Sequence, residues 1–154
     1  MWMAWGRVAG TLSLEDAISV SEQAMERGGL AGKTIHVPTG REDDPDYQAA
    51  IAPLTAFVRE ATGTPHLRIY HSQYALNVAG NPAALTDGMN YIVVRKVTNE
   101  MTILHECAHV IRRTSGASGH DRAFAVTALD LYAKHISPAA GEQFWSLLDA
   151  AGYV

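Results

Sequence analysis

The sequence predicts an α+β fold in a single domain covering residues 1–154, and three observations support this prediction. Stretches with apolar residues at helical spacing, flanked by capping and stop signals, recur along the chain. Short β-branched runs lie between them, the clearest at residues 91–97. No repeat, linker or low-complexity tract divides the chain. A chain of this size buries roughly 70% of its unfolded surface, which is enough for an independent core.

Capping and stop signals set the bounds of the expected helices. Ser13 and Asp16 form a capping box at the start of the first helix. Asp44 and Ser137 each precede a proline, which is favoured at the first helical position. Glycines mark several of the helix ends. The expected helices run over residues 13–28, 44–63, 98–113, 120–135 and 137–152.

Strands are expected where β-branched and aromatic residues gather between turn signals. The run from Tyr91 to Val97 is the clearest, because it is β-branched and nearly continuous. Residues 38–44 form a polar loop, and Asn81-Pro82 and Asp87-Gly88 punctuate a turn-rich connection before that run. The expected strands cover residues 34–37, 67–70, 74–78 and 91–97.

An H-E-x-x-H motif, His105 to His109, lies inside the helix expected after residues 91–97. Residues four apart on a helix lie nearly one above the other, so both His side chains can direct a ring nitrogen at one ion, while Glu106 projects beside them. Two neutral imidazoles and an adjacent carboxylate are what a hydrolytic zinc site needs. The competing interpretation is a surface helix in a chain that has 7 His. The face expected to be buried comprises Met101, Leu104, Ala108 and Ile111.

Catalytic zinc sites use three protein ligands and leave one position open, so a third ligand is expected after this helix. Residues 115–119 are small and predict a turn, and His120 follows them directly. His120 is therefore the expected third ligand. Asp121 is the alternative, since carboxylates also bind zinc; otherwise it orients a ligand His or stabilises the start of the next helix through the helix dipole.

The segments His105-Glu106-x-x-His109 and Gly119-His120-Asp121-x-x-Phe124 resemble the zincin metallopeptidases, among them the SprT-like proteins. They look closer still to the small putative metallohydrolases of actinobacteria and their phages. The resemblance implies a zincin-like domain, in which a small mixed sheet packs on helices and the motif lies on a central helix. It also implies that His105, His109 and His120 bind Zn²⁺. In such sites the residue equivalent to Glu106 is the general base that takes a proton from the zinc-activated water.

Several features separate the chain from other zinc peptidases. The metzincin pattern needs a Gly and a third His where this chain has Arg112 and Ser115. A thermolysin-like site would use a downstream Glu, and the only one after Glu106 is Glu142. Fuller SprT-like proteins often carry a Cys-rich zinc ribbon, whereas this sequence has 1 Cys, which argues against a role in DNA repair.

Composition narrows the expected partners and compartment. A net charge of −4 is not typical of a nucleic-acid binder. The arginines near the motif, Arg112, Arg113 and Arg122, could form a local basic patch, but solvated helix surface is the favoured interpretation. Cys107 is expected to be a small buried side chain, and a sequence without a disulfide fits a reducing cytoplasm. No apolar run approaches the roughly 18 residues of a membrane span, and the first residues lack the pattern of a signal peptide. We expect a cytoplasmic protein, and the sequence does not indicate its oligomeric state.

The sequence leaves three functions open. The first is a zinc-dependent peptidase acting on a protein or peptide, the second a hydrolase of a non-peptide amide, and the third a non-catalytic zinc-binding adaptor on a retired peptidase fold. Glu106 favours an enzyme, because a structural zinc site has no use for a base. An extended peptide would pair with an edge strand, for which residues 91–97 and 74–78 are the candidates. Candidate donors to the oxyanion are Tyr132, Tyr91, Arg122 and His71.

Overall fold

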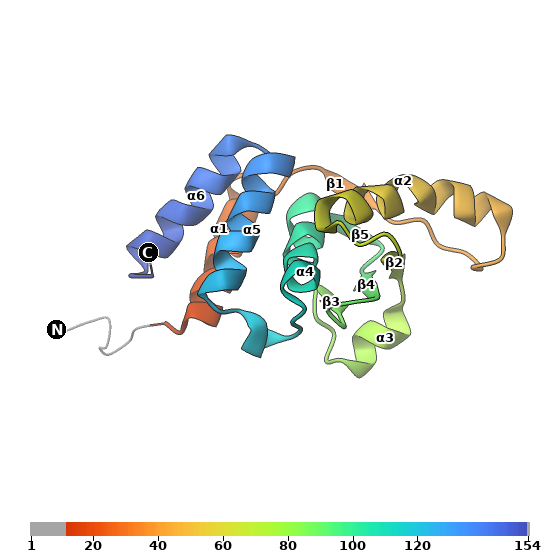
Figure 1. Cartoon of the computed structure of the whole chain (residues 1–154), viewed down its shortest axis with the longest axis horizontal. Coiled ribbons are helices and arrows are strands. Elements are labelled where there is room, and N and C mark those ends of the chain that lie inside the picture. Colours follow the sequence, from red (N-terminus) through yellow and green to blue (C-terminus); the bar gives the residue numbers. More distant parts are fainter. Residues whose placement is uncertain (1–11, 154) are drawn as a thin grey trace.

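The computed structural model describes residues 12–153, in which helices accompany a three-stranded and a two-stranded sheet (Figure 1). The α+β class predicted from the sequence is confirmed. The helices are α1 (Leu14–Arg27), α2 (Pro45–Thr62), α3 (Gln73–Val78), α4 (Glu100–Arg112), α5 (Arg122–His135) and α6 (Pro138–Ala150), with a 3₁₀ turn, η1 (Ala117–Gly119), between α4 and α5. The strands are β1 (Thr34–His36), β2 (Arg68–His71), β3 (Ala84–Thr86), β4 (Tyr91–Val94) and β5 (Val97–Asn99).

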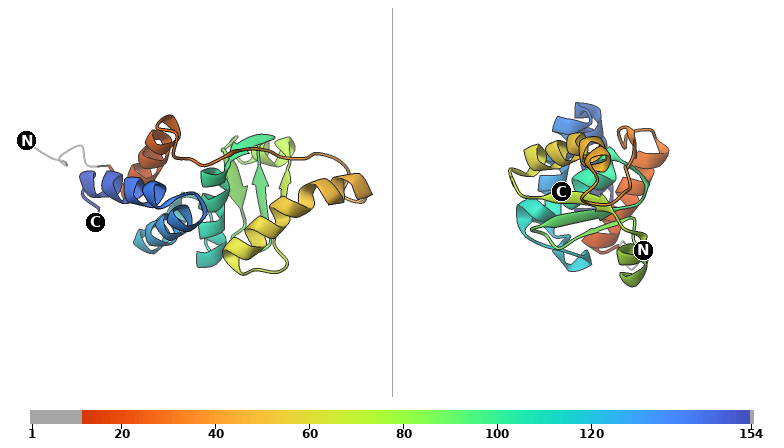
Figure 2. Two further views of the ribbon diagram at one scale, coloured as in Figure 1. Left: turned by 90° about the horizontal axis from the view of Figure 1, so that it is seen from above. Right: turned by 90° about the vertical axis from the view of Figure 1, so that its right-hand side faces the viewer.

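Helix α4, which carries the H-E-x-x-H motif, lies at the centre of the molecule (Figures 1 and 2). On one side of it α1, α5 and α6 pack together, and we call these three helices the helical half. On the other side lie α2, α3 and the five strands, which we call the sheet half. Helix α4 contacts α5 from the first group and α2, β3, β4 and β5 from the second. Residues of the motif are therefore placed at the junction of the two halves.

The three-stranded sheet is mixed, in agreement with the expectation. Strand β4 is central, parallel to β2 and antiparallel to β3, with Leu85 of β3 opposite Val93. Strands β1 and β5 form the antiparallel pair, in which Ile35 lies opposite Thr98. Strand β3 is thus an edge strand of the three-stranded sheet, and it contacts α4.

The buried face of α4 anchors the motif in the core. Leu104 and Ala108 are fully buried, as predicted, and Cys107 is a buried free thiol whose pKa is raised by burial. Ile111 is 40% exposed, so its predicted burial is wrong. It lies in the last turn of α4, where the chain leaves the core. None of the helices within residues 12–153 is long and apolar enough to span a membrane.

The prediction of a strand over residues 74–78 is wrong, because this segment belongs to α3. The hydroxyl of Ser72 accepts a hydrogen bond from the backbone N–H of Ala75 and so caps a helix. Tyr74 and Val78, four residues apart, are 79% and 72% exposed, while Leu76 is buried. The alternation of apolar residues suggested a strand, but the local cap and the single buried side chain suit a short helix.

The prediction of one strand over residues 91–97 is also wrong in part. Strand β4 ends at Val94, and after Arg95 and Lys96 the chain enters β5, which pairs with β1 instead. Two exposed basic residues interrupt the apolar run at this point. The turn-rich connection before β4 holds β3, a short strand that the sequence did not predict. Its three residues lie between two turns and are recognised only through their pairing with β4.

Candidate metal centre

The start of α4 is fixed by hydrogen bonds that set the direction of the motif. The side chain of Asn99 accepts a hydrogen bond from the N–H of Thr102 at 2.8 Å, which caps the helix. Glu100 in the first turn accepts one from the N–H of Lys33 at 2.7 Å. With this end held, the helix presents His105 and His109 on the same face, one turn apart.

A close turn after α4 delivers His120 to the same face. Arg113 ends the helix in the left-handed conformation, with φ at 54°, and η1 then leads into His120. Gly119 in this turn lies so close to its neighbours that a Cβ would stand 2.8 Å from Cβ of Thr114 and 3.3 Å from Nδ1 of His109. The segment therefore needs glycine at this position to bring His120 against the helix.

Asp121 caps a helix and does not belong to the group of three His side chains. Its carboxylate accepts a hydrogen bond from the N–H of Phe124 at 2.9 Å and caps α5, and the side chain is exposed. Helix α5 accordingly begins at Arg122, two residues later than the sequence predicted. The interpretation of Asp121 as a residue that stabilises a helix start is the one that fits.

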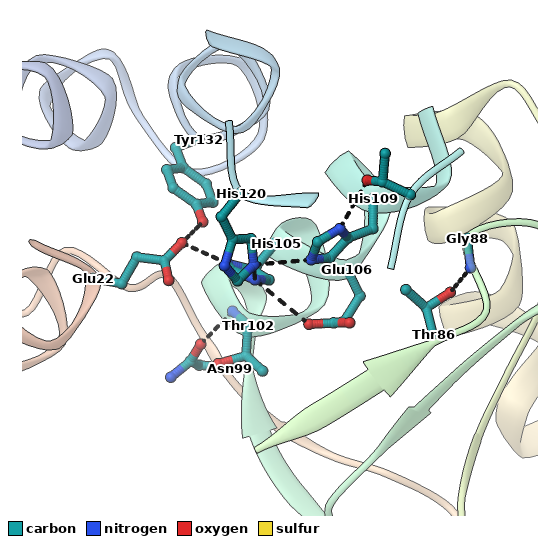
Figure 3. Close-up of polar contacts among 11 residues, drawn as sticks. Glu22, Thr86, Gly88, Asn99, Thr102, His105, Glu106, His109, His120 and Tyr132 are labelled. Carbon is teal, nitrogen blue, oxygen red and sulfur yellow. Dashed lines mark hydrogen bonds and ion pairs between the residues drawn. The ribbon is translucent and has the colours of Figure 1, made fainter. Parts of the chain in front are cut away.

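The three His side chains bring their Nε2 atoms together (Figure 3). Nε2 of His120 lies 3.0 Å from Nε2 of His105 and 3.0 Å from Nε2 of His109. A tetrahedral ion with metal–nitrogen bonds of about 2.0–2.1 Å would hold its nitrogens about 3.3 Å apart, so this spacing fits a shared metal ion. Among the described residues these three form a group that can hold such an ion.

Phe124 of α5 forms a common backing for the three imidazoles. Its ring centroid lies 4.9 Å from that of His105, 4.5 Å from that of His109 and 4.8 Å from that of His120. Because the Phe124 ring is fully buried, it closes the core side of the cluster to water. The cluster is therefore accessible to a substrate only from its opposite side.

The Nδ1 atoms of the three His rings, which point away from the cluster, have different hydrogen-bond partners. Nδ1 of His105 lies 2.8 Å from a carboxylate oxygen of Glu22, and Nδ1 of His109 lies 3.0 Å from the hydroxyl oxygen of Thr114. Nδ1 of His120 is buried and has no hydrogen-bond partner among the described residues. Sequence reasoning missed both Glu22 and Thr114. Glu22 follows Ile18 by four residues, so its position on the inner face of α1 was a signal that could have been used.

Burial and charge act together on the pKa values of these groups. Burial lowers the pKa of His105, but the Glu22 carboxylate outweighs that effect and raises it to about 9. Burial, aided by the charge of His105, lowers the pKa of His109 to about 3 and that of His120 to about 4. Burial also raises the pKa of Glu106 to about 7. His109 and His120 are thus neutral at pH 7, the form in which imidazole binds a metal.

Glu106 lies beside the cluster, at the floor of a cleft. One carboxylate oxygen is 3.8 Å from Nε2 of His105, and the side chain is 9% exposed. The cleft has a volume of about 550 Å³ and lies between α1 on one side and β3 on the other. Among the described residues, no arginine or lysine lines this cleft. The lining includes Ile18, Glu22, Ala84, Leu85, Thr86, Met101, His105, Glu106, His109 and His120.

None of the four candidate oxyanion donors lines this cleft. Tyr132 is fully buried and its hydroxyl donates to Glu22, while Nδ1 of His71 lies 2.7 Å from the carbonyl oxygen of Val94. Arg122 is exposed elsewhere, and Tyr91 belongs to the central strand. The other arginines near the motif, Arg112 and Arg113, are also exposed, in agreement with solvated helix surface.

The two candidate edge strands are corrected by the sheet topology. Residues 91–94 are β4, which is paired on both sides, and residues 74–78 are helical. Strand β3 is the edge that reaches the cleft, through Ala84, Leu85 and Thr86.

Comparisons with family models, with curated proteins and with solved structures find no match to this chain. What the cluster can do chemically therefore follows from its donor atoms, the carboxylate beside them and the cleft.

Proposed function

We propose that this protein is a zinc-dependent metallopeptidase, in which His105, His109 and His120 bind Zn²⁺ and Glu106 is the general base. The observation that carries the proposal is the convergence of the Nε2 atoms at 3.0 Å with the Glu106 carboxylate beside them at the floor of the cleft. Three imidazoles are a ligand set of catalytic zinc sites, which keep a further position open. Zinc held there would act as a Lewis acid and lower the pKa of water toward about 7.

The chain's own groups would then carry the proton transfers. Glu106 lines the cleft beside the cluster, so its carboxylate would accept a proton from a water molecule bound there as that water attacks the carbonyl carbon. The same carboxyl would return the proton to the leaving amine. Phe124 would keep bulk water from the rear of the cluster, which strengthens electrostatic interactions inside the site.

The wall formed by β3 favours a peptide over another amide. Strand β3 pairs with β4 on one side, and residues 84–86 line the cleft beside the His cluster. An edge strand offers backbone N–H and C=O groups to which an extended peptide can add as a further strand. Such pairing would place a peptide bond along the cleft without requiring particular side chains.

Replacement of Glu106 by Gln tests the proposed base. Glu106→Gln keeps the size of the side chain but cannot accept the proton, so hydrolysis should fall by about 10²–10⁴-fold while zinc content stays unchanged. The measurement is cleavage of a mixed-sequence peptide library, followed by mass spectrometry, with zinc content determined on the same samples. Glu142→Gln, at an exposed position of α6, is the matched control and should cleave like the wild type.

Other outcomes would assign the site differently. Equal turnover by wild type and Glu106→Gln would remove Glu106 as the base. Zinc binding with cleavage of simple amides but not of peptides would favour the non-peptide hydrolase. Zinc binding with no turnover of either class would favour the non-catalytic adaptor.

A further inference from the structure

We propose that Glu22 on α1 is the positioning residue of the metal centre, that it directs Nε2 of His105 toward the ion, and that Tyr132 of α5 holds Glu22 in place. The proposal rests on metal binding by the His cluster, the first part of the proposed function, and is independent of peptide hydrolysis. Nothing in the H-E-x-x-H motif itself specifies this pair, because Glu22 and Tyr132 lie on other helices.

One carboxylate oxygen of Glu22 receives two donors. It lies 2.8 Å from Nδ1 of His105, and the Tyr132 hydroxyl donates to the same oxygen (Figure 3). The side chains of Glu22 and His105 are each 14% exposed, and that of Tyr132 is fully buried. Hydrogen bonds to an ionised, largely buried acceptor are about twice as strong as those between neutral groups. The pair therefore ties α1 to α4 and α5 at the metal centre.

The contact decides which nitrogen of His105 is available. Imidazole binds a metal through a ring nitrogen that carries no proton, so the one proton of the bound His105 ring belongs on Nδ1, where the Glu22 carboxylate accepts it. Nε2 then has a free lone pair for the metal, and it is the nitrogen that faces His109 and His120. A carboxylate behind a ligand His also makes the imidazole a stronger donor to the metal.

Tyr132 fixes the carboxylate instead of acting in the cleft. Its ring packs edge-on against Phe144 with centroids 5.2 Å apart, so the hydroxyl has a defined position. A second contact steadies the same helix, because Asn99, the cap of α4, donates to Glu26 at 2.8 Å, one turn beyond Glu22. Helix α1 is thus held to α4 by two side chains a turn apart, and only the Glu22 contact reaches a ligand.

The three His residues differ in the hydrogen-bond partner of Nδ1, so the effects of removing these partners on metal affinity can be ranked. His105 has a charged partner, His109 has the neutral hydroxyl of Thr114, and Nδ1 of His120 has none among the described residues. Loss of the Glu22 carboxylate should therefore weaken metal binding more than loss of the Thr114 hydroxyl.

Zinc affinity, measured by competition with a chelator, is the first test. Glu22→Ala should weaken zinc binding by about 10–100-fold. Glu22→Gln should lie between Glu22→Ala and wild type, because its amide oxygen can accept the Nδ1 proton but carries no charge. Tyr132→Phe and Thr114→Val should each have smaller effects than Glu22→Ala. As a control, Glu15→Gln repeats the Glu-to-Gln change two turns away from Glu22 on α1, and it should leave the zinc affinity unchanged.

A second measurement separates positioning from a merely structural role. In the metal-free protein, proton and ¹⁵N NMR should detect the Nδ1–H of His105, because a hydrogen bond to a shielded carboxylate slows its exchange with water. The signal should disappear in Glu22→Ala and persist in Glu15→Gln, with the fold of each variant checked by thermal unfolding. If Glu22→Ala does not fold, Glu22→Gln serves in its place, with a shifted signal expected.

The two measurements distinguish this proposal from the proposed function. Absence of zinc binding by the wild type would remove the metal site, and with it this proposal. Zinc binding without peptide cleavage would leave the role of Glu22 intact. Wild-type zinc affinity in Glu22→Ala, or an Nδ1–H signal of His105 unaffected by that change, would overturn the proposal.

Discussion

The helical half and the sheet half meet at α4, but they supply different parts of the site. Helices α1 and α5 supply Glu22, Tyr132 and Phe124, which surround the His rings of α4 and the turn after it. The sheet half supplies β3, whose residues Ala84, Leu85 and Thr86 line the cleft. Within residues 12–153, the group suited to a metal draws no ligand from the sheet half. The division suggests that metal binding and substrate binding can be altered separately.

The largest effect is expected at the proposed third ligand, His120, which lies in the turn between α4 and α5. His120→Ala removes one of the three imidazoles, so zinc affinity should fall by more than about 100-fold, the upper range for loss of a residue behind a ligand. Native mass spectrometry and chelator competition would measure it. Asp121→Ala is the control: it should keep zinc while lowering the free energy of unfolding by about 1 kcal/mol through loss of the α5 cap. Zinc retained by His120→Ala but lost by Asp121→Ala would reverse the assignment.

An intermediate effect is expected from the sheet side. Leu85→Ala removes an apolar side chain from the cleft wall, so kcat/KM for a peptide should fall by about tenfold. Zinc affinity should not change, since Leu85 belongs to β3 and is no ligand. Met89→Ala, in the exposed turn after β3, is the control and should behave as wild type. A change in zinc affinity on Leu85→Ala would break the division between the halves.

The smallest effect concerns α4 itself. Arg113 ends this helix with φ at 54° and ψ at 47°, a conformation that glycine adopts without strain. Arg113→Gly should therefore raise the free energy of unfolding by about 0.5–1 kcal/mol without affecting zinc affinity, because relief of about 1–2 kcal/mol of left-handed strain exceeds the entropic cost of glycine. Arg112→Gly, at the last residue of α4, should instead lower it by up to about 0.8–1 kcal/mol, the cost of glycine in a helix interior. Thermal unfolding of the metal-free proteins compares the two, and equal signs would contradict this account of the helix end.

The parts of the site that were predictable from the sequence are the local ones. The sequence predicts that His105 and His109 lie together because helical geometry alone relates residues four apart, and that His120 joins them because a short turn limits how far the chain can travel. The three Nε2 atoms do come together, and their role as metal ligands stays a prediction. Glu22 was missed because its contact with His105 spans 83 residues, and no local pattern encodes it. The expectations of a single domain, a cytoplasmic location and no nucleic-acid partner stay predictions.

The same distinction between local and long-range contacts explains the errors in the predicted helices and strands. Helix boundaries depend on caps such as Asn99 and Asp121, which act over three residues and can be recognised in the sequence. Strand partners depend on contacts between distant segments. The run 91–97 looked continuous, but β4 pairs with β2 and β3, whereas β5 pairs with β1. A three-residue strand such as β3 has too little pattern of its own to be found without its neighbour.

The spacing of the His residues also bears on how the protein folds. Nε2 contacts join residues only 11 and 15 positions apart, so closing the chain around an ion costs little entropy even before the core has formed. An unfolded chain that retains metal reduces the gain in stability that the ion gives to the native state. The link from Glu22 to Tyr132, in contrast, joins segments 110 residues apart and exists only once the helices have assembled. Under the proposed function, the preference of the ion for the folded chain would therefore depend on α1 rather than on the motif that first binds it.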